Sequence, residues 1–587
     1  GADLSGTTLA NANAIVKENA NESTYEGFRA SIKHEINDDW DALATFGTQS
    51  IDADGVFFVD PTLGDLEIQR YTDDSIEDEY DNMSLTLTGS IGDLEVVYAG
   101  AYTDRTSDQN VDYTDYLFVG QYLPYYICDY YVTYTSFAPG NVPTGSCGAP
   151  NLLVDSTTST EVTTHELRIS GPINDTMSFT AGAFTSDLEL KELNLFNYPG
   201  SVGNDITYAP NYALTDISST GAINNGAAGW FSAGPYSEPV IFFNDIKRTD
   251  KQKGIFGEIR MDVSETSELT VGARWYDIEV DFEGSANSSF SNGFGNTDQQ
   301  KFGTNLSAQY APGNAGGYPD TAGSDGVIGK ITYSWNPSED LMYYVTWSEG
   351  FRPGLLNRPV GRSNAAGTYS VKPVVESDEV TNLEFGWKAV LADGKLRFNG
   401  SAFMVDVSGL QTTVFDPSIV NLFFSDNAAD AEISGVEGDF IYIPEAEGWT
   451  ISGAFSLLNT EITKSLVPTD DIKVGSDLAF APGIQGNLAA RKEWSMASGN
   501  TGHYQAQLTW SDDSFSDVME PNRAVQDSYS FINVRAGISN DAWLAEMYID
   551  NITDERAEIN NTFVFDRQRV GIIRPTTLGL RFKRFFN

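Results

Sequence analysis

The chain has 587 residues and a formal net charge of −48 at pH 7. This charge excludes a nucleic-acid-binding protein, because phosphates would be repelled, and any membrane contact must come from apolar surface. No run approaches the roughly 18 apolar residues that a spanning helix needs, whereas 54 Gly, 28 Tyr and 34 Phe favour strands joined by turns.

Segments in which apolar and polar residues alternate recur along the chain and predict β-strands. The first is YEGFRASIKHEI at 25–36, which runs into a short turn. In the clearest hairpin, Leu383 and Phe385 share one face while Glu384 lies on the other, and an Asp-Gly turn at 392–395 leads to the next strand. Counting such hairpins predicts about 19 strands, within the range of large barrels.

Short and long connections alternate along the chain. The short turns lie at 36–41, 90–95, 172–177, 264–269, 336–341, 392–395, 443–449, 496–502 and 539–543. The long segments cover approximately 106–160, 189–249, 282–324, 353–378, 409–430, 463–483, 512–527 and 555–575. Soluble domains favour short connections, whereas outer-membrane barrels have short periplasmic turns and long external loops. The pattern predicts an all-β fold, a transmembrane antiparallel β-barrel; an array of soluble β-sandwiches is the alternative.

In such a barrel the apolar strand faces contact lipid and the polar faces line the lumen. The final strand, in RPTTLGLRFKRFFN, has its lipid-facing residues at Leu578, Leu580, Phe582 and Phe586. Charged residues within other strands are expected to face the lumen or a polar plug, among them Arg168, Arg260, Glu384 and Arg397.

Strand parity predicts that the barrel extends beyond this chain. The first strand runs into a short turn and the last strand follows a long loop, so both point toward the periplasm and their count is odd. Bacterial single-chain barrels have an even number of strands. We therefore expect at least one strand ahead of Gly1, and the first residues, GADLSGTTLANANAIV, lack the basic start and apolar core of a signal peptide.

Two loop features could carry recognition. Cys128 and Cys147 are expected to form a disulfide in a Tyr-rich loop, because two cysteines supply too few ligands for zinc. The aromatic faces of that loop, at Tyr125, Tyr126, Tyr130 and Tyr131, could stack on a sugar ring or a planar chelate, or the loop could fold on itself. A calcium ion is chemically possible at Asp108, Asp112 and Asp115, although their spacing is not that of an EF-hand.

The sequence predicts no enzyme. It contains no Gly-rich phosphate loop, HExxH, CxxC or GxSxG motif, and His34, His165 and His503 each stand alone in a strand pattern. We expect no cofactor other than the possible loop-bound calcium.

The chain resembles the barrel of a TonB-dependent outer-membrane receptor. Four segments resemble successive strands and hairpins of that family: YYVTWSEGFRPGLLNRP (343–359), SDEVTNLEFGWKAVLADGKLRFNGSAFMVDVSGLQ, AEISGVEGDFIYIP and FINVRAGI…AEMYIDNITDERA. The final segment, RPTTLGLRFKRFF, resembles its terminal strand. The resemblance implies that residues 1–587 belong to a 22-stranded barrel filled by an N-terminal plug. Neither the plug nor a TonB-contacting segment is found in this sequence, and we expect both, with about three strands, upstream or on another polypeptide.

The resemblance also implies a function. The protein is expected in the outer membrane of a Gram-negative bacterium, with long loops extracellular, importing a ferric siderophore or similar metal chelate with energy delivered by TonB. The implied partners are outer-membrane lipid, the plug, the TonB complex, a small-molecule or glycan ligand and the barrel-assembly machinery, which reads a terminal aromatic residue such as Phe586; here Asn587 follows it. The alternatives are TonB-dependent uptake of an oligosaccharide, a passive porin, and a surface adhesin or phage-docking barrel.

Overall fold

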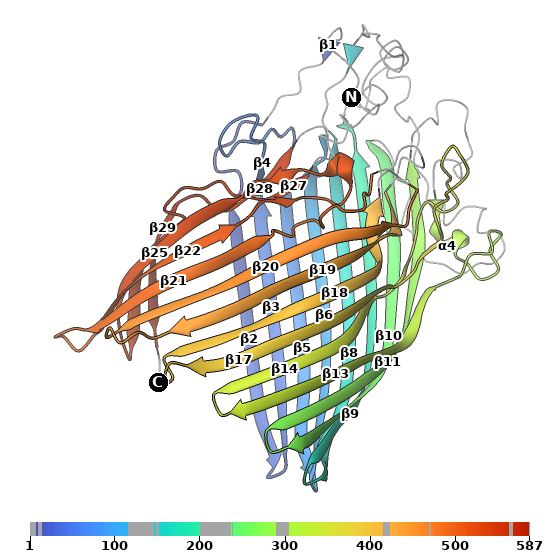
Figure 1. Ribbon diagram of the computed structural model, residues 1–587. Coiled ribbons are helices and arrows are strands. Elements are labelled where there is room, and N and C mark those ends of the chain that lie inside the picture. The colour runs from blue at the N-terminus through green and yellow to red at the C-terminus, as the bar shows by residue number, and fades with distance from the viewer. Residues whose placement is uncertain are drawn as a thin grey trace.

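The computed structural model describes residues 8–9, 15–114, 146–147, 152–199, 236, 239–288, 304–414, 419, 423–468, 471–562 and 568–585. One antiparallel sheet of 19 long strands curls into a barrel (Figure 1). The predicted all-β fold and strand number are confirmed. No helix among the described residues is long and apolar enough to cross a membrane.

The first nine strands of the barrel are β2 (Ser23–Asn37), β3 (Trp40–Asp54), β5 (Ser75–Ile91), β6 (Leu94–Asp112), β8 (Leu153–Asn174), β9 (Met177–Asn197), β10 (Val240–Ser264), β11 (Ser267–Ser288) and β13 (Ala322–Ser338). The other ten are β14 (Leu341–Arg352), β17 (Asp378–Leu391), β18 (Leu396–Val414), β19 (Phe424–Tyr442), β20 (Trp449–Ser465), β21 (Ile484–Ser495), β22 (Thr501–Ser511), β25 (Tyr529–Asn540), β26 (Trp543–Asp550) and β29 (Thr577–Arg584).

The described parts of the connecting segments carry only short elements. These are β1 (Thr8–Leu9), β4 (Phe58–Val59), β7 (Ser146–Cys147), β12 (Thr304–Asn305), β15 (Leu355–Leu356), β16 (Val374–Val375), β23 (Ser514–Phe515), β24 (Val525–Gln526), β27 (Glu558–Thr562), β28 (Arg569–Ile572), helix α4 (Leu306–Gln309) and the 3-10 turn η5 (Glu520–Asn522).

The connections sort the barrel into two ends, which we call the turn end and the loop end. Each predicted short turn joins two paired strands at the turn end, and the long connections gather at the loop end (Figure 1). The turn at 392–395 has positive φ at Ala392, Asp393 and Gly394 (53°, 56° and 84°). Three consecutive residues with positive φ are typical of a tight turn. Asp and Gly adopt positive φ more readily than most residues.

Several strands extend further into the loop end than the sequence predicts, and a long connection at 55–74 was not predicted. Strand β6 continues to Asp112, which pairs with Leu153 of β8, although we expected a loop from 106. Residues 104–112, DRTSDQNVD, are polar on both faces, so the apolar alternation ends while the backbone pairing continues. Alternation of apolar and polar residues identifies a strand with one apolar face, but not a strand that is polar on both faces.

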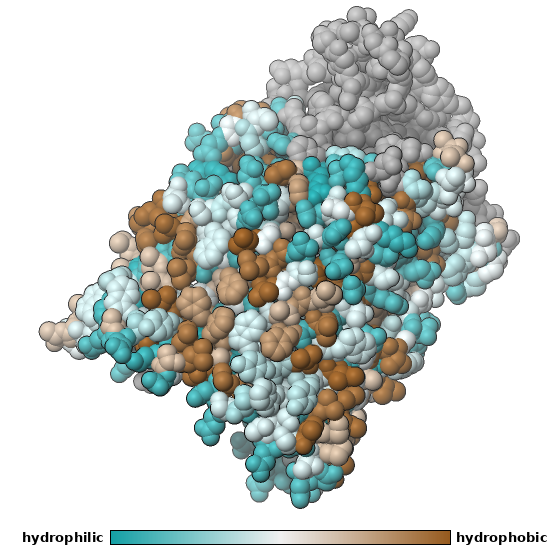
Figure 2. Space-filling model, in the orientation of Figure 1, coloured by the Kyte–Doolittle hydropathy of each residue, from teal (hydrophilic) through white to brown (hydrophobic). Residues whose placement is uncertain are grey.

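The apolar faces of the strands point outward. Leu383 of β17 lies opposite Met404 of β18, and both are about half exposed, as is Phe385. Figure 2 shows hydrophobic side chains gathered over the middle of the visible wall, with hydrophilic side chains prominent toward the loop end. A soluble sandwich would bury these side chains, whereas a membrane-spanning barrel presents them to lipid.

The two terminal strands of the sheet each have a single neighbour. Among the residues that the structure describes, β2 pairs only with β3 and β29 pairs only with β26. All 15 residues of β2 are exposed. Because all the pairs between neighbouring long strands are antiparallel and the count is odd, β2 and β29 run in the same direction. An antiparallel closure between them therefore requires an odd number of further strands.

Candidate functional site

The inner face of the barrel is polar and held by cross-strand pairs. Arg260 forms an ion pair with Glu268, and Lys330 Nζ lies 2.9 Å from Glu258 Oε2. The hydroxyl of Tyr344 donates a hydrogen bond to Glu384. These side chains alternate along their strands with outward apolar residues, so they line the lumen, as strand pleating requires.

The lumen residues proposed from the sequence follow the same alternation. Arg168 adjoins the exposed Leu167 in β8, and its guanidinium lies 3.8 Å from the carboxylate of Glu166. Arg397 alternates with Phe398 in β18. The structure places Arg168, Arg260, Glu384 and Arg397 on four different strands, and their roles toward a plug or a cargo stay predictions.

A buried charged group near the turn end was missed by the sequence analysis. His503 of β22 is 1% exposed, and its Nε2 lies 2.9 Å from Glu546 Oε2, while Arg581 of β29 donates to Glu546 Oε1 at 3.2 Å. A Cβ on Gly537 would lie 2.7 Å from the His503 ring, so glycine makes room for the imidazole. His503 looked like an isolated wall residue because its partner is 43 residues away and only the strand register brings them together.

Three apolar clusters lie among the described residues of the loop end, and two of them are large. In the first, Tyr276 and Phe282 of β11 pack with Leu306 and Tyr310 of the α4 region and with Leu356 of β15. The second cluster contains Val371, Val414, Phe424, Ile462 and Met519. Burial of these side chains compensates the loss of chain entropy on ordering the long connections.

The connection between β14 and β17 reaches across the loop end. Arg358 donates a hydrogen bond to Asn244 of β10, 114 residues away in sequence, and its guanidinium lies 5.9 Å from the Phe242 ring. The buried Asn357 side chain donates to the carbonyls of Lys372 and Ser425. This connection therefore spans β11 and β13, the two strands that separate β14 from β10 in the sheet.

Loops from opposite ends of the described chain also meet at the loop end. β4 pairs with β28, and the guanidinium groups of Arg70 and Arg569 each lie 5.6 Å from the Phe58 ring. Arg556 binds Asp65 through two contacts of 2.9 and 3.0 Å, which lowers the pKa of that carboxyl group. These contacts connect the β3–β5 loop to the β26–β29 loop.

A cavity of 510 Å³ lies among five segments of the loop end. It is lined by Arg352, Leu355, residues 411–413 of β18, Ser425, Phe480 and residues 516–518. Arg352 is oriented by Asp378, whose side chain is 1% exposed and which also accepts a hydrogen bond from the Arg352 amide. The cavity is lined mainly by polar residues, and its apolar residues are Leu355, Ala479, Phe480 and Val518.

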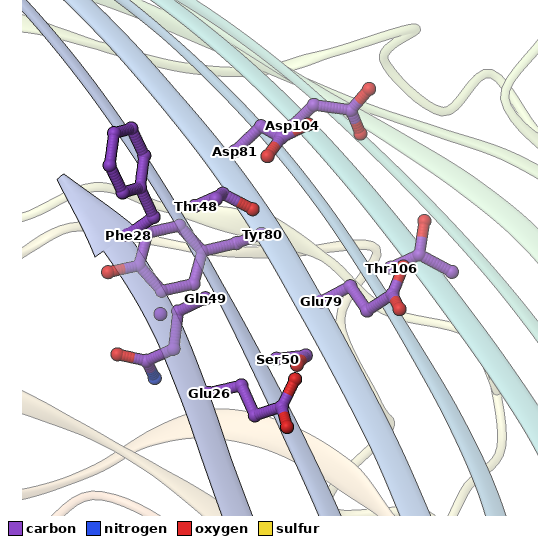
Figure 3. Close-up of a pocket in the computed structure, with 11 residues that line it drawn as sticks. Glu26, Phe28, Thr48, Gln49, Ser50, Glu79, Tyr80, Asp81, Asp104 and Thr106 are labelled. Carbon is purple, nitrogen blue, oxygen red and sulfur yellow. The ribbon is translucent and has the colours of Figure 1, made fainter. Parts of the chain in front are cut away.

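A second cavity, of 570 Å³, lies between β2, β3, β5 and β6 and is lined by four carboxylates, those of Glu26, Glu79, Asp81 and Asp104. Figure 3 shows these side chains on the same side of the strands as Phe28. Asp81 precedes the exposed Met83 by two residues, so the acidic cavity opens on the outer face of the wall. It is therefore not part of the lumen.

The proposed loop recognition residues are described only in part. Tyr125, Tyr126, Cys128, Tyr130, Tyr131, Asp115 and Phe586 lie outside the described residues, and Cys147 is described only as part of β7, which pairs with β1. Their proposed ligand-binding, disulfide and calcium roles stay predictions.

Two of the three proposed calcium ligands are described. The buried Asp112 carboxylate accepts hydrogen bonds from the backbone amides of Thr72 and Thr114, and Asp108 accepts one from the Thr157 hydroxyl. No cluster of three potential metal ligands occurs among the residues that the structure describes. Asp112 acts as a structural acceptor here, and the proposed calcium site is untested without Asp115.

At the outward face of β29, Leu578, Leu580 and Phe582 are 68%, 83% and 69% exposed. They continue the apolar faces of Met547 and Ile549 in the neighbouring strand. This is the arrangement expected of a terminal strand in contact with lipid.

Comparison with known proteins gives a consistent result. Residues 130–552 match the family model described as "TonB dependent receptor-like, beta-barrel". The fold is similar to the ferric yersiniabactin uptake receptor FyuA from Yersinia pestis (TM-score 0.68, 12% identity, 96% of this chain and 71% of that chain). It is also similar to the siderophore receptor PiuA from Acinetobacter baumannii (TM-score 0.61, 15% identity, 96% of this chain and 74% of that chain). A third similar structure is that of the ferric citrate transporter FecA (TM-score 0.64, 12% identity, 96% of this chain and 70% of that chain).

Proposed function

Since the chain belongs to the family of TonB-dependent receptors, we propose that it is the barrel of a transporter that imports a scarce nutrient across the outer membrane. The family consists of transport receptors and not of enzymes. Energy for import would come from TonB, as expected of a member of this family. The observation that carries this proposal is the family match over most of the barrel.

The proposed cargo is a ferric siderophore or a similar metal chelate. Its support is the similarity in fold to receptors for ferric yersiniabactin, other siderophores and ferric citrate. At 12–15% identity these similarities concern the fold, so the cargo has to be measured directly.

The proposed orientation has the loop end outside the cell and the turn end in the periplasm. Long connections and short turns are distributed in this way in outer-membrane barrels. The polar lumen would then receive a plug domain, and an odd number of strands from the same or another polypeptide would close the wall between β2 and β29.

Uptake of radiolabelled iron tests the proposal. Cells that produce the intact receptor should accumulate ⁵⁵Fe from an active ferric chelate when TonB is present and not when TonB is deleted. Receptor-null cells provide the background. Accumulation that is independent of TonB would indicate a passive pore and refute energised import. TonB-dependent accumulation of an oligosaccharide, with no response to any chelate, would retain energised import and refute the iron cargo.

A further inference from the structure

We propose that Lys492, near the turn end of β21, binds the phosphate group of a membrane phospholipid on the outer surface of the wall. Three aromatic residues complete the site: Trp449 of β20, Trp494 of β21 and Tyr504 of β22. The proposal goes beyond the import of a cargo, because it concerns the outer surface and depends only on contact between that surface and lipid.

The strand register places Lys492 on the lipid-facing side of the wall. Lys492 lies opposite Trp449 in β20 and Tyr504 in β22, and residues that lie opposite each other project from the same face. Four residues earlier on that face of β21, Leu488 lies opposite Leu508, and the two are 42% and 37% exposed. Lys492 therefore lies at the turn-end limit of the apolar outer surface and not in the lumen.

A cation at this position needs an anionic partner. Lys492 Nζ donates a hydrogen bond to the backbone carbonyl of Glu447 and lies 5.9 Å from the centre of the Trp449 ring. Both contacts orient the ammonium group, but neither supplies a full negative charge. Ionisable side chains that face the membrane are costly unless they are paired. The phosphate group of a phospholipid is an anion that occurs at the edge of the apolar layer, where it can pair with this ammonium group.

Two of the three carboxylates that flank the site in the sequence are engaged by other cations. Glu493 Oε1 lies 2.8 Å from Arg491 Nε, and both residues belong to the lumen face of β21. Glu445 Oε1 lies 3.0 Å from Lys395 Nζ. The third residue, Glu447, contributes its backbone carbonyl to the site. A phosphate could therefore approach the ammonium group without displacing the carboxylate of Glu445 or Glu493.

The aromatic rings indicate that this part of the wall lies at the level of lipid headgroups. The centre of the Tyr504 ring lies 5.9 Å from that of Trp449 and 5.8 Å from that of Trp494. Tyr504 and Trp494 are 45% and 42% exposed, so a lipid can contact both rings. Trp and Tyr collect at membrane interfaces because each combines an apolar ring with a polar group. The rings and the apolar surface beyond them would contact the acyl chains of a lipid whose phosphate lies at Lys492.

Native mass spectrometry of the intact receptor in detergent, titrated with phosphatidylglycerol, tests the site. Lys492→Gln removes the charge and keeps a polar side chain, so we expect the dissociation constant of the tightest-bound lipid to rise about tenfold or more. Lys492→Arg keeps the charge and should retain binding. Lys253→Gln is the matched control, because Lys253 is an exposed lysine on the outer face at the loop end, opposite Asp277; it should leave binding unchanged.

Cross-linking locates the bound lipid. A phosphatidylglycerol that carries a diazirine in its headgroup should label peptides from 443–449 and 492–504 in the wild type and label them only weakly in Lys492→Gln. Trp449→Leu, which removes the ring and keeps an apolar residue, should weaken the same labelling. Circular dichroism identical to that of the wild type shows that a variant has folded, so a loss of labelling then reports on binding.

Competition tests the phospholipid assignment. A diacylglycerol, which has the acyl chains but no phosphate, should compete poorly for the site, and so should inorganic phosphate, which has no acyl chains. Displacement of the lipid by inorganic phosphate at equal concentration would indicate a site for a free anion and overturn the assignment. Displacement by diacylglycerol would show that the phosphate is not recognised and would also overturn it.

The outcomes separate this proposal from that of the previous section. Equal affinity of the wild type and Lys492→Gln, or cross-links that do not depend on Lys492, would refute the phospholipid site even when TonB-dependent iron uptake is normal. If the lipid binds as expected while every chelate fails in uptake, the phospholipid site stands and the iron cargo is wrong.

Discussion

Asn551 stabilises the start of the last long loop, and its replacement gives a sharp test of how that loop is held. The residue is 3% exposed and has φ 50°. Its Nδ2 donates to the carbonyls of Glu555 at 2.9 Å and Arg574 at 3.0 Å, and its Oδ1 accepts from the Glu555 amide at 2.9 Å. The side chain thereby ties the beginning of the loop to its end.

The expected loss follows from these contacts. Three hydrogen bonds to backbone groups contribute about 1 kcal/mol each, so Asn551→Gly should destabilise the loop by about 3 kcal/mol. Asn551→Ala should cost about 1 kcal/mol more, because alanine is disfavoured at positive φ whereas glycine is not. These values correspond to roughly 150-fold and 800-fold increases in the equilibrium constant for opening of the loop.

Hydrogen exchange measured by mass spectrometry in detergent is the assay. Protection of the Glu555 amide should fall in the order wild type, Asn551→Gly, Asn551→Ala, while exchange in β22 stays unchanged. Equal protection in wild type and Asn551→Gly would refute the assigned hydrogen-bond role. Equal protection in the glycine and alanine variants would refute the strain argument alone.

Two further predictions concern the wall and the loops. Leu508→Arg, on the outward face of β22, should lower stability by about 2–4 kcal/mol in urea unfolding if that face contacts lipid, whereas Gln507→Arg on the lumen face should have little effect; equal losses would contradict the assigned orientation. The pKa of Asp554 is held well below its usual value by hydrogen bonds from Arg556 and Thr576. Because the pKa of Asp554 is lower in the folded state, the stabilisation from its ionised carboxylate is complete above about pH 4. That stabilisation is lost only as the pH falls toward the lower pKa of the folded state. The Thr576 amide donates to Asp554 Oδ1 at 3.0 Å. Its protection from hydrogen exchange should therefore persist from pH 5 to pH 4 and decline only below pH 4. A loss of protection that is already complete at pH 4 would contradict the lowered pKa of Asp554.

The barrel wall can be located from the sequence because contact with lipid requires strands with one apolar face and one polar face. Leu383, Phe385 and Glu384 reveal both the strand and its faces without knowledge of any neighbour. The short turns could also be predicted, since the local backbone preferences of Asp393 and Gly394 favour a chain reversal. The nine short turns and the membrane-facing parts of the strands were therefore predictable from the sequence.

The structure of the loop end was harder to predict from the sequence. The extension of β6 to Asp112 was missed because polar strands above the membrane carry no apolar alternation, and only pairing with β8 shows that they continue. The candidate cavity was missed for a related reason: Arg352, Thr413, Phe480 and residues 516–518 have no common spacing in the sequence.

Periodicity and turn chemistry are local, so the sequence by itself determined the strand count, the lipid-facing residues and the all-β class. Cross-strand register and loop packing are long-range, so only the tertiary structure decided that His503 meets Glu546 and Arg581, or that the β14–β17 connection reaches β10. The physical reason is that a strand's two faces are set by its own side chains, whereas its partners are set by the closure of the whole sheet.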